Sequence, residues 1–202
     1  MHWRRDMPGR KAEVERKTKE TQIRVAIDLD GTGELDIATG IGFFDHMLTA
    51  LAKHGLFDLR VQAKGDLEID PHHTVEDVGI VLGRAIDKAL GDKAGIVRFG
   101  WAVVPMDRAL VLTSIDLSGR GLLCYEVPIE QEKIGALDTV LISEFFESVA
   151  RNSGMTLHIR KLAGDDPHHT AEAVFKSFAK ALQAAVRISE RIQGVPSTKG
   201  IL

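Results

Sequence analysis

Every second residue from position 23 to position 29 is apolar, and the alternate positions 18, 20, 22 and 24 carry polar residues. Because successive side chains of a strand point to opposite faces, this alternation predicts one long half-buried strand that starts near Glu13 and carries Glu20 on its polar face. The sequence DGTG at 30–33 indicates a turn, and ELDIAT at 34–39 predicts a second strand.

Two later segments repeat apolar residues at the spacing of a helix. In residues 42–55, Phe44, Leu48 and Leu51 form one apolar stripe, and the glycine at the end supplies a C-terminal stop. Residues 72–91 form a second helical pattern, which opens with two histidines and also ends at a glycine. The segment between the two helices returns to the pattern of a strand.

The same order of elements recurs in the rest of the chain. Strands are predicted at 96–104, 109–117, 122–127 and 155–162, and helices at 139–152 and 168–187. The stretch DPHHT occurs in both series, at 70–74 and at 166–170, and each copy lies at the start of the second helix of its series. A repeat of about 96 residues indicates a duplicated domain rather than a solenoid, whose units are shorter and more numerous.

The predicted fold class is therefore α+β, a tandem duplication of two similar half-domains. Each half-domain is expected to be a small mixed β-sheet with two helices on one face, and the helices are expected to pack between the two sheets. We expect the first half-domain at 1–93, the second at 94–188 and a tail at 189–202, and we interpret residues 1–10 as a loose arm.

Composition narrows the class of protein. The 202 residues are 44% hydrophobic and carry a formal net charge of −3 with both signs well mixed, so a nucleic-acid or anionic-membrane partner has no electrostatic support. Cys124 is the only cysteine, which excludes an intramolecular disulfide and favours a reducing compartment. No apolar run is long enough for a membrane span, and the start lacks the apolar core of a secretory signal, so we expect a cytoplasmic protein.

The strongest chemical signal is the doubled DPHHT stretch with its following glutamate. Residues four apart share a face of a helix, so His72 pairs with Glu76 and His168 with Glu172. Each copy offers an imidazole and a carboxylate to one ion and a second imidazole to another, a donor set that suits Mn²⁺, Fe²⁺, Zn²⁺ or Ni²⁺. The alternative is a pair of exposed histidines near a helix start, with the glutamate as a capping partner. The duplication favours metal binding.

Two further histidines lie on the first helix, His46 and His54, both on the face opposite its apolar stripe. His46 adds to the metal signal, whereas His54 alone is more typical of a helix C-terminus, where a cation is favourable.

Several basic residues would suit an anionic substrate. Lys176 continues the stripe of His168 and Glu172 and would place a cation beside the metal. Arg98, Arg120 and the Ser-Thr-Lys sequence at 197–199 have the chemistry of a phosphate-binding group. Each basic residue alone is more typical of a solvated surface.

Nine stretches occur in a characteristic order: RKTKET, LDGTG, GFFDHML, HHTVEDVGI, PMD, DLSGR, LHI, HHTAEAVFKS and STKGIL. From about residue 12 to the C-terminus the chain resembles the imidazoleglycerol-phosphate dehydratase family, enzymes of histidine biosynthesis. The resemblance implies removal of water from imidazole-glycerol phosphate to give imidazole-acetol phosphate, with two Mn²⁺ ions per active site. It also implies a homo-oligomer of about 24 chains with closed symmetry and active sites between subunits.

The resemblance further implies the roles of individual residues. One ion would be held by His46, His73, His168 and Glu172, and the other by His72, Glu76 and His169, with Glu144 at the position of a fourth ligand. Glu20 would be an active-site glutamate, and the substrate would be contacted by Glu20, His54, Arg98, Arg120, Lys176, Ser197 and Lys199.

The chain departs from the family pattern at two positions. Glu144 stands where many members have histidine, and three outcomes stay open there: direct coordination, coordination through water, or a site with three protein ligands. Arg108 stands where glutamate is often found, and no role is assigned to it. The neighbouring Asp107 is either an active-site polar group or a turn residue.

The implied reaction removes a hydroxyl from the carbon attached to the ring and a proton from the next carbon. Two metal ions on the ring nitrogens would stabilise an imidazolate, whose electrons would expel the hydroxyl. Glu20 is the candidate for one proton transfer, and a metal-bound water or His54 for another.

Two other classes of protein stay open on the residues alone. A dinuclear metal hydrolase of phosphate esters would need a metal-bridging water where a dehydratase needs the ring. A metal-storage or structural metal protein would have no use for convergent arginine, lysine and Ser-Thr-Lys groups.

Overall fold

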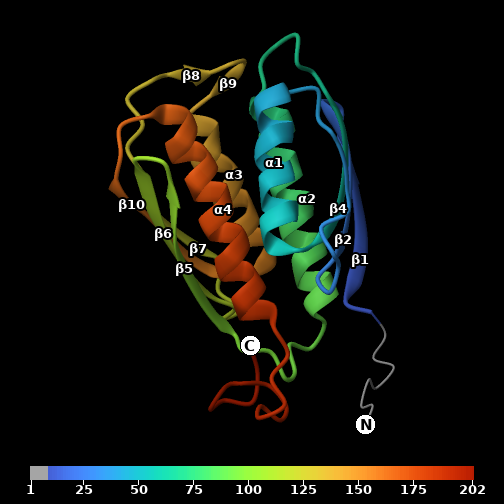
Figure 1. Cartoon of the computed structure of the whole chain (residues 1–202). Helices are drawn as coiled ribbons and strands as arrows, with labels where there is room; N and C mark the ends of the chain where they lie inside the picture. Colours follow the sequence, from blue (N-terminus) through green and yellow to red (C-terminus); the bar gives the residue numbers. More distant parts are fainter. Residues whose placement is uncertain (1–8) are drawn as a thin grey trace.

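Two four-stranded sheets form the outer layers of the fold, and four helices lie between them (Figure 1). The structure, a computed structural model, describes residues 9–202. The first sheet has the order β1-β2-β4-β3 and consists of β1 (Lys11–Lys17), β2 (Thr21–Asp28), β3 (Leu35–Ala38) and β4 (Asp58–Gly65). The second has the order β5-β6-β10-β7 and consists of β5 (Phe99–Met106), β6 (Ala109–Asp116), β7 (Leu122–Glu126) and β10 (Thr156–Ala163).

The two sheets have the same pattern of pairing, with two antiparallel pairs and one parallel pair each. The helices are α1 (Gly42–Gly55), α2 (His72–Leu90), α3 (Val140–Ser153) and α4 (Pro167–Val186). The first two pack on the first sheet and the last two on the second, so the α+β duplication with helices between two mixed sheets is confirmed.

The four helices all begin at the same end of the molecule, the upper end in Figure 1. Along the interface of the two halves α1 lies beside α4, and α2 lies beside α3. A Cβ atom on Gly79 would come within 2.7 Å of the carbonyl oxygen of Phe145, and one on Gly83 within 2.7 Å of that of Val149. Glycine at these two positions therefore lets α2 and α3 approach to backbone contact.

The outer faces of the two sheets differ in chemistry. The inner faces are buried in both, as Ile23, Val25 and Ile27 show for β2. The outer face of the first sheet carries charged pairs such as Arg24 with Glu13. By contrast, the outer face of the second sheet exposes large apolar side chains: Phe99, Trp101, Val103, Leu122 and Leu162. Phe99, Trp101 and Val103 alternate along the edge strand β5, and an exposed apolar strip of this kind is typical of a protein–protein contact.

Three sequence predictions differ from the structure. The single long strand is two strands, because the Thr18 hydroxyl accepts the backbone N–H groups of Glu20 and Thr21 and closes a turn between them. The predicted strand at 96–104 begins only at Phe99, since the N–H group of Arg98, which has a φ of 74°, bonds to the end of α4. A short hairpin of β8 (Lys133–Ile134) and β9 (Leu137–Asp138) was not predicted.

Of the predicted N-terminal arm, residues 1–8 lie outside the described residues. Arg10 is fixed by an ion pair with Asp30 at 2.5 Å and by a hydrogen bond to the carbonyl group of Val186. None of the helices in the described part of the chain combines the length and apolarity that a membrane crossing requires.

Candidate active site

At the start of each histidine-bearing helix, an aspartate of the DPHHT stretch, and not the glutamate, accepts a hydrogen bond from a backbone N–H group. Asp166 is the N-cap of α4, and its carboxylate accepts the backbone N–H of His169 at 2.7 Å. Asp70 accepts the backbone N–H of His72 at 2.7 Å at the start of α2. These bonds contradict the alternative in which Glu76 and Glu172 serve as capping partners at the helix starts. Glu76 and Glu172 are therefore available to the neighbouring imidazoles.

Three predicted ligands converge between α1 and α4. Glu172 Oε2 lies 3.3 Å from His46 Nε2 and 3.5 Å from His168 Nε2. One donor atom from each of the three residues lies within 4.8 Å of the other two. His46 and His168 are exposed, whereas Glu172 is buried, so the group opens to the surface on the imidazole side. Two imidazoles and a carboxylate at this spacing can hold a divalent transition metal.

A cation lies beside this group, as the helical spacing predicts. Lys176 Nζ is 2.5 Å from Glu172 Oε1, one turn further along α4. Burial alone would raise the pKa of Glu172, but the hydrogen bond and charge of Lys176, with His46, outweigh it and hold that pKa below its ordinary value. Glu172 is thus ionised at neutral pH, the form that binds a metal.

His54 lies at the other end of α1 and faces the same helix, α4. Burial lowers its pKa, and the charges of Lys176 and Lys180 lower it further. His54 is therefore a neutral imidazole at pH 7, which can accept a proton.

The remaining predicted ligand of the first ion, His73, is not part of this group. Its Nδ1 lies 3.0 Å from a carboxylate oxygen of Asp66, which comes from the loop before α2. That hydrogen bond raises the pKa of His73. With Nδ1 bound to Asp66, Nε2 is the nitrogen left to coordinate a metal, an arrangement common for metal-binding histidines.

We expect Asp66→Asn to lower the pKa of His73 toward the ordinary histidine value in metal-free protein. The reason is that the substitution removes the charge that stabilises the imidazolium. The measurement is an NMR titration of the histidine ring protons. Asp165→Asn is the matched control, because Asp165 follows the equivalent glycine in the second half but pairs with Arg108 at 3.6 Å. An unchanged His73 pKa in Asp66→Asn would contradict the conclusion that the Asp66 carboxylate raises this pKa.

The predicted ligands of the second ion are divided between two places. His72 Nε2 lies 3.9 Å from Glu76 Oε2 at the start of α2. His169 Nε2 lies 3.4 Å from a carboxylate oxygen of Asp107, in the turn between β5 and β6. Asp107 has a φ of 46°, which is typical of a turn residue. It is therefore a turn residue and, through its carboxylate, also a neighbour of a candidate ligand. Glu144 is half-buried on α3 and belongs to neither pair.

Glu20 is exposed at the tip of the turn between β1 and β2, and not on the face of a strand. The next residue, Thr21, bonds Asp77 on α2, one helical turn after His73. The negative charge of Glu20 contributes to the raised pKa of His73. The turn thus brings a free carboxylate to the end of the molecule where α2 begins.

The predicted phosphate-binding residues gather at the opposite end. Arg98 is held by the carboxylate of Asp116 at 2.7 Å and donates to the carbonyl of Pro196 in the tail at 2.8 Å. A Cβ on Gly119, next to Arg120, would contact the C-terminal Leu202. The C-terminal segment with Ser197 and Lys199 therefore lies beside both arginines.

This second group is far from the first. The backbone N–H of Arg98 donates to the carbonyl of Ala185, which follows Glu172 by 13 residues on α4. At the rise of an α-helix, that separation is about 20 Å. Within one chain the metal-binding group and the phosphate-binding group cannot reach the same small molecule.

Sequence reasoning missed three contacts at the site. These are the bond of Asp66 to His73, the contact of Asp107 with His169, and a buried cluster around Asp77 described below. In each contact, a residue of a helix meets a partner from a loop or a strand, and no spacing along the chain indicates that the two meet.

Comparisons with known proteins identify the family of this chain. Residues 39–182 match the family described as imidazoleglycerol-phosphate dehydratase. The chain is 58% identical over 193 residues to the protein of that name from Acetivibrio thermocellus, covering 96% of this chain and 99% of the relative. The crystal structure of the enzyme from Pyrococcus furiosus is 41% identical with a TM-score of 0.81, covering 94% of this chain and all of that one.

A crystal structure of the enzyme from Staphylococcus aureus also has a TM-score of 0.81, at 36% identity, covering 89% of this chain and 99% of that chain. Both the family match and the identities extend over most of the molecule, including the two histidine-bearing helices. The chain belongs to the imidazoleglycerol-phosphate dehydratase family.

Proposed function

We propose that this chain removes water from imidazole-glycerol phosphate to give imidazole-acetol phosphate, at a site with two Mn²⁺ ions that bind the imidazole ring. The observation that carries the proposal is the group of His46, His168 and Glu172, backed by Lys176. The family comparison supports a dehydratase of histidine biosynthesis and does not favour a phosphate-ester hydrolase or a metal-storage protein.

The donors present fit manganese. Imidazole nitrogens with an ionised carboxylate suit Mn²⁺, whereas Mg²⁺ and Ca²⁺ prefer oxygen ligands alone. His46, His73, His168 and Glu172 would hold one ion, and His72, Glu76 and His169, with Glu144, the other. When bound, the ions supply positive charge that favours the deprotonated imidazole ring of the substrate.

The chain's own residues supply the remaining parts of the reaction. Glu20 is exposed and close to His73, so its carboxylate can take or return a proton at the side chain of the substrate. His54 is neutral and can accept another. Arg98, Arg120, Ser197 and Lys199 would hold the phosphate, far from the reacting carbons, and so fix the orientation of the substrate.

The separation of the two groups requires more than one chain per site. The ring and the phosphate of the substrate are joined by only three carbons, which cannot span the distance along α4 from Glu172 to Ala185. We infer that the phosphate-binding end of one chain meets the histidine-bearing end of another, in a homo-oligomer. The exposed apolar face around Trp101 supports self-association, and the size of about 24 chains stays a prediction.

The test is ketone formation from imidazole-glycerol phosphate by purified protein that has been stripped with chelator. We expect no turnover without metal and full turnover after addition of Mn²⁺, because the ions would supply the positive charge that favours the deprotonated ring. Mg²⁺ is the control ion and is expected to restore little. Metal uptake without any ketone would refute the proposed reaction while leaving the metal site in place.

A further inference from the structure

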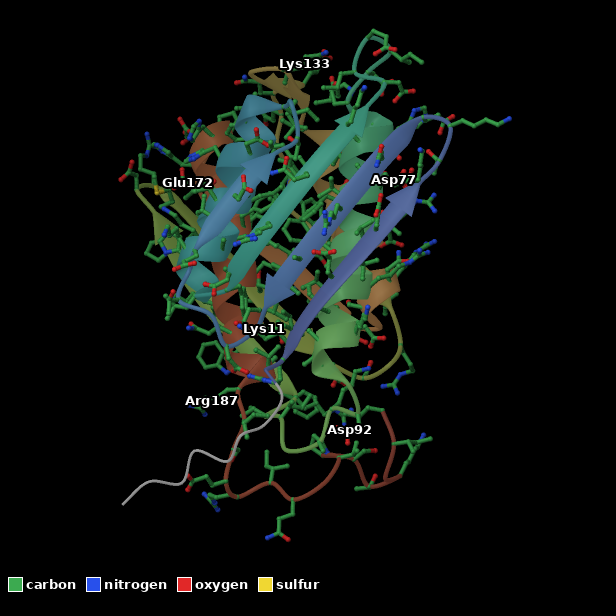
Figure 2. The ribbon with its side chains drawn as sticks, turned by 90° about the vertical axis from the view of Figure 1, so that its right-hand side faces the viewer. Lys11, Asp77, Asp92, Lys133, Glu172 and Arg187 are labelled. Atoms are coloured by element: carbon green, nitrogen blue, oxygen red, sulfur yellow. The ribbon has the colours of Figure 1, made fainter. Side chains whose placement is uncertain are left out.

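A buried carboxylate, Asp77, lies directly after Glu76 on α2. Only 6% of this residue is exposed, and it points away from the candidate metal ligands toward the first sheet. Its Oδ1 accepts a hydrogen bond from Nε of Arg16 at 2.7 Å, and its Oδ2 accepts one from the hydroxyl group of Thr21. In Figure 2, Asp77 lies at the end of the sheet where β1 and β2 are joined.

The two partners of Asp77 lie on the two sides of one turn. Arg16 is near the end of β1, and Thr21 is the first residue of β2. Between them, the Thr18 hydroxyl accepts the N–H groups of Glu20 and Thr21, and the Thr18 N–H donates to the carbonyl of Thr21. The turn that carries Glu20 is thus held internally by Thr18 and held to α2 by Asp77.

The second half-domain shows which residues the same fold has at the positions of Arg16, Thr21 and Asp77. Thr21 pairs with Gly65 in the first half, and Ala109 lies against Gly164 in the second, so Thr21 corresponds to Ala109. Asp77 follows Glu76 as Ala173 follows Glu172. The pairing of β1 with β2 corresponds to the pairing of β5 with β6. In this correspondence Val104 on β5 is the counterpart of Arg16 on β1.

The second half therefore builds the same sheet and helices with valine, alanine and alanine. A buried ion pair adds little to stability compared with apolar residues of similar volume, because desolvation offsets the attraction. In the same register, the turn between β5 and β6 has Arg108 at the position of Glu20, and the carboxylate of that turn, Asp107, lies 3.4 Å from His169 Nε2. The fold of a half-domain does not require the polar cluster, and its presence coincides with the turn that carries the proposed proton-transfer group.

We propose that Asp77 is a positioning residue, which fixes the distance between Glu20 and the metal-binding end of α2 by bonding both strands that flank the Glu20 turn. The proposal rests on the proposed function for the role of Glu20. The consequence is that the geometry of the cluster sets the rate of the proton transfer and leaves metal affinity and substrate affinity unchanged.

The decisive experiment transfers the residues of the second half into the first, as the variant Arg16→Val with Thr21→Ala and Asp77→Ala. Manganese stoichiometry is expected to stay at the wild-type value and KM within about threefold. The value of kcat is expected to fall about 100-fold, as for a misplacement of about 1 Å in a catalytic group. Hydrogen exchange is expected to become faster at residues 18–21 and to stay unchanged elsewhere. A wild-type kcat in a variant with a freed turn would overturn the proposal.

A milder pair of variants covers the case in which the triple variant fails to fold. Thr21→Val removes one hydroxyl from the cluster and should lower kcat several-fold. Thr113→Val is the matched control, because it removes another fully buried hydroxyl, one that bonds Ser177 at 2.7 Å in the second half. The control is expected to keep the wild-type kcat; equal kcat in the two variants would contradict the proposal.

Failure of the proposed function and failure of the role of Asp77 would give different results. Absence of ketone formation by wild-type protein with Mn²⁺ would refute the proposed function. Hydrogen exchange at residues 18–21 would still show whether Asp77 holds the turn, since that measurement needs no substrate.

Discussion

Replacement of Glu20 by glutamine is expected to remove nearly all turnover while both manganese ions stay bound. Glutamine keeps the size and the hydrogen-bonding shape of the side chain but cannot take or return a proton. General acid–base catalysis contributes about 10²–10⁴ in rate, so kcat should fall by about that factor. Glu20 is exposed at the tip of a turn and forms no part of the core, so the variant should fold as the wild type does.

The measurements for this variant are steady-state kinetics and the number of Mn²⁺ ions per chain. Glu15→Gln is the control, because Glu15 is also an exposed glutamate near the start of the chain but contacts Gln22 on the outer face of the sheet. It should keep full activity. An inactive Glu20→Gln protein that had also lost metal would leave the proton-transfer role without support, and an active one would refute it.

Two inactive variants are expected to restore activity when they are assembled together. His168→Ala removes a ligand at one end of the chain, and Arg120→Ala with Lys199→Ala removes phosphate contacts at the other. A site formed by two chains can take its metal-binding part from one variant and its phosphate-binding part from the other. In a random mixture of equal amounts, each part of a site is intact in about half of the cases. About a quarter of the sites would therefore have both parts intact, if two different surfaces of the chain meet at each site.

The mixture would be dissociated, combined and reassembled with Mn²⁺ before the assay. Each variant treated alone is the control and should stay inactive. A differently tagged pair shows by co-purification whether mixed assemblies have formed. Mixed assemblies without activity would mean that each site takes both of its parts from a single chain, which contradicts the separation measured along α4.

The duplication could be predicted from the sequence because the DPHHT stretch and the order of strands and helices both recur. Residues four apart on a helix share a face wherever the helix lies, so the pairing of His168 with Glu172 and of Glu172 with Lys176 followed from spacing alone. The strand and helix limits were close for the same reason, since alternation and the helical period are properties of neighbours in the chain.

The rest depended on contacts that spacing does not encode. Alternating polar residues continue through the turn at Glu20, so the sequence showed one strand where a Thr18 hydroxyl in fact reverses the chain. The resemblance assigned His73 to the same ion as His46, yet the fold of a single chain holds it on Asp66. Which ligands would meet in the proposed homo-oligomer depends on surfaces that a single sequence does not show.

The common direction of the four helices gives each chain an electrical polarity. Each helix carries partial positive charge at its start and partial negative charge at its end, and parallel helices add these charges instead of cancelling them. The starting end of the molecule holds the histidine-bearing motifs, and the finishing end holds the arginines and the tail. A neighbour whose finishing end meets the starting end of this chain places opposite partial charges together. The direction of the helices thus favours a head-to-tail contact over a head-to-head one, the order of subunits that the proposed site requires.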